Sequence, residues 1–201
     1  MWPLLFFSIA TVAIVLERAV FFLYHNLKVD DLKETTTAAV RSGNFAGARA
    51  FLEGQTRRRV GARVLLALIK RRQSSGPELS ERRLEKAAET EASGSIASLE
   101  SGLNLLTTLA SLAPLTGFLG TVTGMIAAFR SIADAVDVNA QIVAGGIYEA
   151  LITTVFGLCI AIVAMSAHSI FSAVVDRFAS NLEGACSDLI SEICEAPGHE
   201  A

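Results

Sequence analysis

The sequence predicts an all-α membrane protein with three transmembrane helices and long helical extensions outside the membrane. Apolar residues make up 52% of the 201 residues and charged residues only 18%, which is too apolar for a soluble domain of this size (mean hydropathy +0.48). Three apolar runs, 2–24, 102–129 and 138–175, reach the ~20 residues that a helix needs to cross a bilayer. The charged residues gather mainly between the first two runs.

The composition also excludes several classes of function. A net charge of −3 leaves no basic excess for binding nucleic acid. The odd count of three cysteines argues against a disulfide framework. Scattered Cys and His residues form no metal-ligand pattern, and no Ser/His constellation converges within the spans. We therefore expect no catalytic residues, no metal and no cofactor, and predict that the protein is not an enzyme.

The first span is predicted at residues 1–24. Its uncharged core ends at Leu16, and Glu17 and Arg18 follow near the end of the helix. Adjacent opposite charges can sit at the headgroup level there, with the arginine stem reaching toward water. Aromatic side chains that anchor a helix at this level come next: Phe21, Phe22 and Tyr24.

The distribution of positive charge predicts the topology. Residues 25–100 contain 14 of the 17 Lys and Arg residues, so this segment should be cytoplasmic. The N-terminus and the short connector after the second span then lie outside, and the C-terminus lies inside. The basic run is explained by topology alone, or in addition by a contact with anionic lipid or a partner.

Within 25–100, the pattern predicts mainly helices. Helix formers at 30–41 and 45–52 flank the turn sequence Ser42-Gly43-Asn44, which indicates a helical hairpin. A second element, 60–69, places Val64, Leu65 and Leu68 on one face. Residues 74–77 should break the chain. From about residue 80, one helix is expected to run without interruption into the second span, because no proline intervenes before Pro114.

The segment limits follow from these patterns. We predict a first transmembrane helix at 1–24, a cytoplasmic helical region at 25–100 and a second transmembrane helix at 101–130. An outer connector at 131–139, a third transmembrane helix at 140–172 and a cytoplasmic tail at 173–201 complete the chain.

Small and hydroxylated residues form a stripe along each of the last two spans. In the second span they recur at intervals of three and four and so share one helix face: Thr107, Ala110, Pro114, Gly117, Thr121, Gly124 and Ala128. In the third span they occupy a narrow sector: Gly146, Ala150, Thr154, Gly157, Ala161, Ala164 and His168, with Thr153 beside them. The first span has no such stripe.

Two interpretations of the stripes remain open. Small residues allow close helix packing, as in Gly120-x-x-x-Gly124. Small residues with hydroxyl groups also suit a surface that faces water in a central cavity. Glu149 is the only carboxylate in the two clean spans; it either lies near the outer end of the third helix or faces an ion vestibule. Because two spans cannot enclose a pore, the second interpretation requires a homo-oligomer.

Two segments carry a family resemblance. Residues 113–126, APLTGFLGTVTGMI, and residues 145–158, GGIYEALITTVFGL, resemble the second-span and third-span signatures of the MotA/TolQ/ExbB proton channel family. The short outer connector is more similar to the ExbB/TolQ branch than to the MotA branch. Thr123 departs from the family pattern, where a bulkier residue is common, and the resemblance assigns no role to His168.

The resemblance implies a homopentamer in the bacterial inner membrane, with the N-terminus periplasmic and the C-terminus cytoplasmic. A single-span partner resembling ExbD or TolR would fill the pore and carry the intramembrane aspartate, and a TonB- or TolA-like protein would act beyond it. By motif match, Thr121 and Thr154 are the pore threonines, Glu149 the third-span glutamate and Pro114 the second-span proline. The pore-lining set would be Thr121, Thr154, Glu149, Pro114, Thr153, Thr107, Gly117, Gly124, Ala150 and Gly157.

The function implied is that of a proton-channel, or stator, subunit that couples the proton motive force to work at the cell envelope, as ExbB energises TonB-dependent transport. A TolQ-like or gliding-motor stator is the alternative within the family. A structural membrane oligomer without ion conduction is the alternative from another class.

Overall fold

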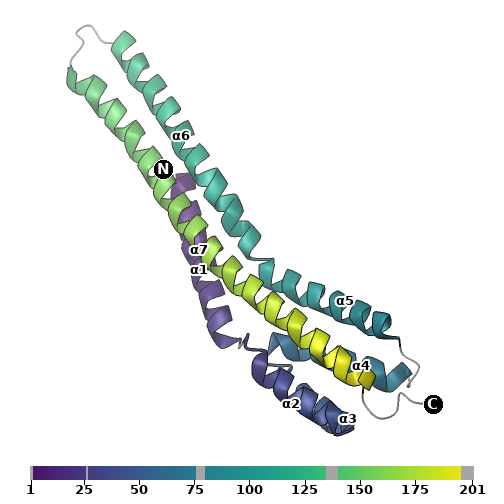
Figure 1. The fold of residues 1–201 in the computed structure, drawn as a ribbon. Helices are drawn as coiled ribbons and strands as arrows, with labels where there is room; N and C mark the ends of the chain where they lie inside the picture. Colours follow the sequence, from purple (N-terminus) through teal and green to yellow (C-terminus); the bar gives the residue numbers. More distant parts are fainter. Residues whose placement is uncertain (1, 26, 76–79, 135–139, 196–201) are drawn as a thin grey trace. The chain divides into compact units, whose positions relative to one another are not determined.

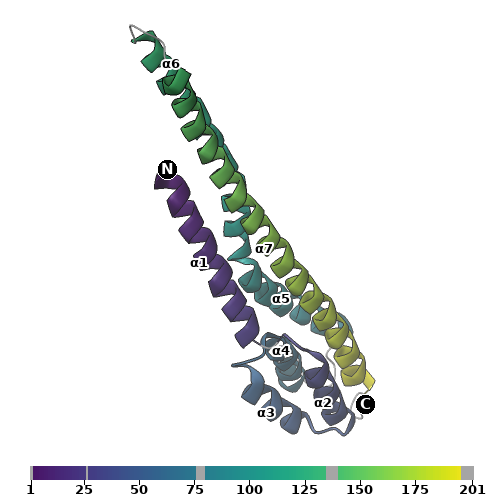
Figure 2. The same cartoon turned by 90° about the vertical axis from the view of Figure 1, so that its left-hand side faces the viewer.

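The computed structural model describes residues 2–25, 27–75, 80–134 and 140–195, and over these ranges the chain is helical with no β-strand (Figures 1 and 2). The helices are α1 (Trp2–Tyr24), α2 (Asp30–Arg41), α3 (Phe45–Gln55), α4 (Val60–Ser75), α5 (Glu81–Glu100), α6 (Leu103–Ala133) and α7 (Ala140–Glu195). Three stretches are long and apolar enough to cross a membrane: Trp2–Tyr24, Glu81–Ala133 and Ala144–Glu195. The prediction of an all-α chain with three candidate transmembrane helices is confirmed.

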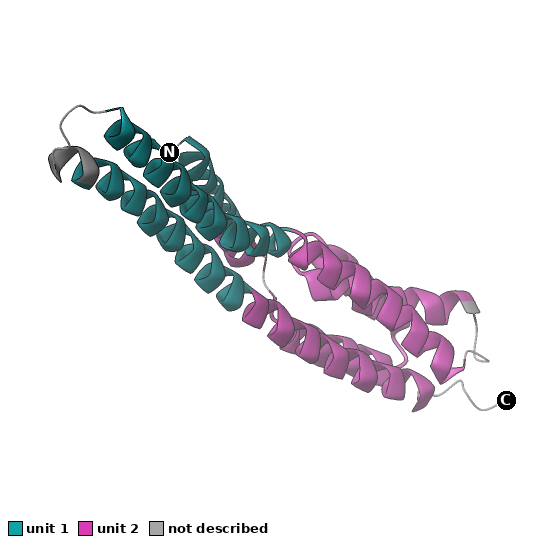
Figure 3. Cartoon of the chain, turned by 90° about the horizontal axis from the view of Figure 1, so that it is seen from above, with its two compact units in different colours: residues 1–18, 102–171 teal, residues 19–101, 172–201 magenta. Residues whose placement is uncertain are grey.

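The chain divides into two compact units (Figure 3). Unit 1 contains residues 1–18 and 102–171, and so holds most of α1, all of α6 and the first part of α7. Unit 2 contains residues 19–101 and 172–201, with α2 to α5 and the last part of α7. The apolar spans therefore belong to unit 1, and the charged segment belongs to unit 2.

Unit 1 has a small core and a large apolar surface. Leu4, Ala113 and Ile160, one from each long helix, form a buried cluster that Phe7 covers. Many large apolar side chains are instead exposed, among them Phe6, Ile9, Leu16, Leu115, Phe118, Ile126, Leu151, Val155 and Ile162. A surface of this kind is stable only against lipid or against other apolar helices.

The expected uninterrupted helix from residue 80 into the second span is wrong at one point. Helix α5 ends at Glu100 and α6 begins at Leu103, although Ser101 and Gly102 keep helical backbone angles. A Cβ atom on Gly102 would overlap the guanidinium group of Arg18. The Arg18 side chain is only 14% exposed, so it packs on this glycine instead of extending into water as the sequence suggested. Glycine is also a poor helix former, and the break falls where α1 approaches.

Unit 2 confirms the predicted helical hairpin. Gly43 has a φ of +71°, which glycine adopts without strain, and it ends α2 at the expected turn. The side-chain oxygen of Asn44 accepts a hydrogen bond of 2.8 Å from the backbone N–H of Gly47 and so caps α3. Val64, Leu65 and Leu68 of α4 are fully buried, as their shared face predicted.

The last helix extends beyond the residues predicted for the third span. Helix α7 continues to Glu195 and includes most of the segment expected to be a tail. Its buried side chains recur at helical spacing: Val175, Phe178, Leu182, Ala185, Leu189 and Ile193. Helix α6, for its part, continues to Ala133, and the rest of the predicted connector, 135–139, lies outside the described residues.

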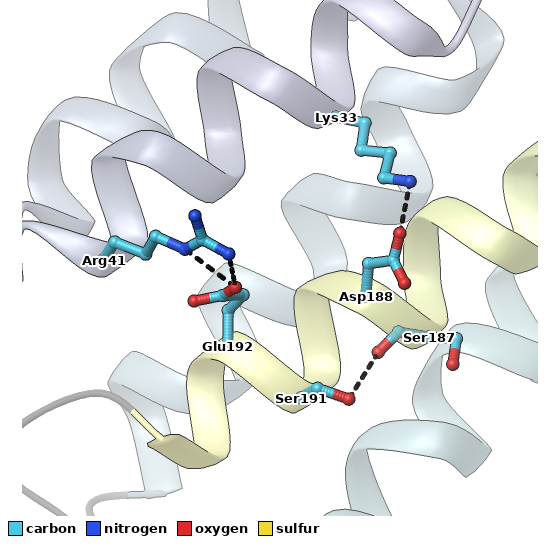
Figure 4. Close-up of polar contacts among 6 residues, drawn as sticks. All are labelled: Lys33, Arg41, Ser187, Asp188, Ser191 and Glu192. Carbon is cyan, nitrogen blue, oxygen red and sulfur yellow. Dashed lines mark hydrogen bonds and ion pairs between the residues drawn. The ribbon is translucent and has the colours of Figure 1, made fainter.

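Two ion pairs join α2 to this last part of α7 (Figure 4). Lys33 pairs with Asp188, and the Nε of Arg41 donates a hydrogen bond of 2.8 Å to Glu192. The Arg41 guanidinium lowers the pKa of Glu192, and hydrogen bonding to Asp188 raises the pKa of Lys33. Both pairs lie one helical turn apart on α7, so they fix the register of α2 against it.

The Arg41–Glu192 pair predicts a pH dependence. A carboxyl group whose pKa falls on folding stabilises the fold above its unfolded pKa of about 4.3, and this contribution is lost as the pH drops through the folded pKa. In Arg41→Gln the pKa of Glu192 should rise toward its ordinary value, and the amides of α2 should exchange faster near neutral pH. Carboxyl titration and amide exchange in detergent measure both effects.

Arg49→Gln is the matched control, because Arg49 pairs with Glu53 inside α3. It should leave the titration of Glu192 unchanged. An unaltered Glu192 titration in Arg41→Gln would show that the pair does not form in solution.

Candidate functional site: the contact between the two striped helices

The stripes of α6 and α7 face each other within one chain. A Cβ atom on Gly117 would lie 2.9 Å from the carbonyl oxygen of Thr153 and 3.0 Å from the Cα of Thr154. A Cβ atom on Gly157 would lie 2.6 Å from the carbonyl oxygen of Ala113. Real Cβ contacts are not this short, so only glycine permits the two backbones to approach so closely.

The contact continues toward the outer ends of both helices. A Cβ atom on Gly124 would lie 2.8 Å from the Cβ of Ala150, and one on Gly146 would lie 2.5 Å from the Cβ of Ala128. Ala150 and Ala128 are both buried. Close packing of small residues, one of the two interpretations of the stripes, is therefore present at Gly117, Gly124, Ala128, Gly146, Ala150 and Gly157.

Gly120 belongs to the same contact, since a Cβ atom there would overlap the side chain of Thr153. Gly120 was not among the predicted site residues, although its small-xxx-small spacing with Gly124 indicated close packing. Ala113, fully buried beside Gly157, was missed as well. Its position between stripe residues gave no signal, because alanine is common in any helix.

Threonine hydroxyl groups join the two helices at mid-length. The hydroxyl of Thr154 donates a hydrogen bond of 3.1 Å to the carbonyl oxygen of Gly117. The hydroxyl of Thr153, which is 7% exposed, lies 2.6 Å from the carbonyl oxygen of Ala150 and 3.3 Å from that of Gly117. Because the Gly117 carbonyl accepts from a neighbouring helix, these bonds fix the register of α6 against α7.

The two other predicted pore threonines bond within their own helix. The hydroxyl of Thr121 donates a hydrogen bond of 2.7 Å to the carbonyl oxygen of Phe118. The hydroxyl oxygen of Thr107 lies 3.5 Å from the carbonyl oxygen of Leu103. Thr123, which differs from the bulkier residue common in the family, is exposed, and its hydroxyl donates a hydrogen bond of 2.9 Å to the carbonyl oxygen of Leu119. A threonine has one hydroxyl proton and two lone pairs. Thr121 and Thr154 thus use their proton on the backbone and keep lone pairs to accept hydrogen bonds.

Three further residues that the sequence singled out differ in their exposure. Pro114 is half-buried inside α6, where its ring removes one backbone donor. Glu149 is exposed beside the buried Ala150. His168 is half-buried on α7. Among the described residues, no group of three or more His, Cys, Asp and Glu side chains is arranged to hold a metal ion.

The site thus combines a close glycine contact with threonine hydroxyl groups that bond to backbone carbonyl oxygens. The sequence profile of the MotA/TolQ/ExbB proton channel family matches residues 56–184, well over half of the chain. The chain belongs to this family. The match includes both striped helices, all ten predicted pore residues and most of the charged helical segment.

Relatives of the ExbB and TolQ branches of the family align with most of the chain. The putative biopolymer transport protein ExbB-like 1 of Synechocystis sp. is 36% identical over 82% of this chain. ExbB-like 3 of the same organism is 33% identical over 87% of this chain and 81% of its own length. The Tol-Pal system protein TolQ of Haemophilus influenzae is 31% identical over 83% of this chain and 75% of its own length. The chain covers 63% of the first of these relatives.

The glycine contact yields a stability prediction. Gly157→Ala should force α6 and α7 apart, because the new methyl group meets backbone atoms that cannot turn away. Overpacking of this kind typically costs about 1–3 kcal/mol, so the free energy of unfolding of unit 1 in detergent should fall by that amount.

Gly145→Ala is the control on the same helix, since a Cβ atom there meets nothing within 4 Å. It should be neutral or stabilise the helix by up to ~1 kcal/mol. Equal effects of the two substitutions would contradict the close approach of the two backbones.

Proposed function

We propose that this chain is a proton-channel subunit of the stator type, which couples the proton motive force to work at the cell envelope. In the more specific form of the proposal the chain is ExbB-like and energises TonB-dependent outer-membrane transport. Family membership and the names of the relatives support the role of a proton-channel subunit of the stator type. The single observation that carries the channel role is the set of threonines whose lone pairs remain available along the α6–α7 contact.

The proposed assembly is a homopentamer in the inner membrane. One α6–α7 pair cannot enclose a pore, so several copies must supply its wall. The polar edges with Thr107, Thr121, Thr154 and Glu149 would face the centre, and α1 would face lipid, since its large side chains are exposed on several sides. The N-terminus would be periplasmic and the C-terminus cytoplasmic, supported by the 14 of 17 Lys and Arg residues in 25–100.

The proposed partner is an ExbD/TolR-like protein whose single transmembrane helix carries an aspartate into the pore. A threonine that has already donated its proton to the backbone can accept a hydrogen bond from a protonated carboxyl group or from water, but it does not titrate. Protonation neutralises the partner's aspartate and removes the cost of holding its charge against an apolar wall. One elementary charge crossing 100 mV releases about 2.3 kcal/mol, which can move the partner relative to the ring.

A TolQ-like role is the second candidate, favoured by the 31% identity with TolQ over 83% of this chain. A gliding-motor stator would use the same parts. Expression in bacteria that lack both ExbB and TolQ separates the two main candidates: an ExbB-like chain should restore TonB-dependent uptake, and a TolQ-like chain should restore envelope integrity.

The burial of the small residues inside one chain also fits a structural oligomer without ion conduction. Partner-dependent proton flux in liposomes discriminates that alternative. Thr154→Val removes the hydroxyl and keeps the shape, so flux should fall about tenfold if one hydrogen bond worth ~1.4 kcal/mol is lost at the barrier. Thr121→Val should reduce flux as well.

Thr154→Ser keeps the hydroxyl and is the matched control, so it should retain flux within about threefold of the wild type. Full flux in both valine variants would exclude the threonines from the pathway. No flux from the intact wild-type complex would favour the structural oligomer.

A further inference from the structure

Unit 2 has a basic groove. Helices α3, α4 and α5 enclose about 1200 Å³, and the cations of its lining are Arg49, Lys70, Arg71, Arg82, Arg83 and Lys86. The single carboxylate in the lining is Glu91. Arg49 and Lys70 are paired with Glu53, at 3.0 and 3.3 Å. Over the described ranges the other four cations take part in no ion pair, so the groove carries a net positive charge.

The same unit has an acidic groove. Helix α5 and the last part of α7 enclose about 490 Å³, and its carboxylates are Glu81, Glu85, Glu89 and Glu183. Within the described part of the chain these four also lack an ion-pair partner. Small and apolar side chains form its floor, among them Ile96 and Ile190. The burial of Cys186 there and the nearby charge of Glu183 raise the pKa of its thiol to about 11, so the thiol stays neutral.

The two grooves are separated on opposite flanks of α5. At about 100° per residue, the α5 residues that line the acidic groove and those that line the basic groove point roughly 150° apart. Leu84 lies between them and is fully buried. Each copy of unit 2 therefore presents a positive surface on one side and a negative surface on the other.

We propose that these grooves are the two halves of a contact between neighbouring copies of this chain, the basic groove of one copy receiving the acidic flank of the next. A surface that differs on its two sides generates a head-to-tail contact, and such contacts form a ring when the rotation from one copy to the next closes. Opposite charges attract the next copy in the correct orientation, and like charges reject a reversed one. The existence of a ring rests on the proposed function. The inference adds that the charged grooves orient neighbouring copies outside the membrane.

Charge reversal tests the contact. Arg82→Glu/Arg83→Glu/Lys86→Glu makes both grooves acidic, and Glu81→Lys/Glu85→Lys/Glu89→Lys makes both basic. These residues are exposed on α5, and the exchanged types have similar helix propensities, so the helix should persist. Each triple variant should dissociate at least tenfold more readily in detergent than the wild type, measured by native mass spectrometry on dilution. Added salt should weaken the wild-type oligomer, because these charges are exposed to screening.

Co-expression keeps the test informative even if one variant folds poorly alone. Differently tagged all-acidic and all-basic chains should copurify with each other at least tenfold better than either does with itself. Arg57→Glu/Arg58→Glu is the matched control: it reverses two exposed cations of the α3–α4 turn outside the basic groove and should dissociate like the wild type.

Three results would overturn the proposal: wild-type dissociation in both reversed variants, equal weakening by the control, or no preference for mixed pairs. Proton flux is read separately on the same samples. An intact, charge-dependent oligomer that conducts no protons would contradict the proposed function and leave this contact in place.

Discussion

Unit 1 depends on the contact of two backbones at Gly117 and Gly157. The absence of side chains at these positions lets α6 and α7 approach until carbonyl groups of one helix are within reach of hydroxyl groups of the other. Thr153 and Thr154 then bond to the Gly117 carbonyl, which fixes the register of the pair. Hydrogen bonds between helices matter more in lipid than the hydrophobic effect does, because lipid tails are as apolar as the side chains they would replace.

The sequence predicted the elements of the fold well where the signal was local. The turn at Gly43 and the buried face of Val64, Leu65 and Leu68 were read correctly, since dihedral preference and helical periodicity do not require knowledge of distant residues. The interruption at Ser101 and Gly102 was missed, although the pair Ser-Gly is a local turn signal. The helical spacing from Val175 to Ile193 was a readable signal for the end of α7, but the charged residues between them obscured it.

The sequence predicted the two helix faces that form the candidate site, but it did not predict that these faces contact each other. Periodicity placed Gly117, Gly124, Ala150 and Gly157 on stripes, yet it could not tell whether the stripes face each other, a pore or a neighbouring copy. The structure shows that the glycines and alanines are used within the chain. Whether any of the ten predicted residues also lines a pore stays a prediction.

In the proposed channel, the donated hydroxyl protons of Thr121 and Thr154 would also bear on which ion passes. An oxygen atom whose proton is already engaged offers the same electron-rich surface to a protonated acid, to water and to a dehydrated sodium ion. Such a wall lowers the barrier for any small cation and does not choose among them. In the proposed complex, ion selectivity would therefore be a property of the acid that the partner supplies, and the same five-fold wall would serve partners that carry different ions.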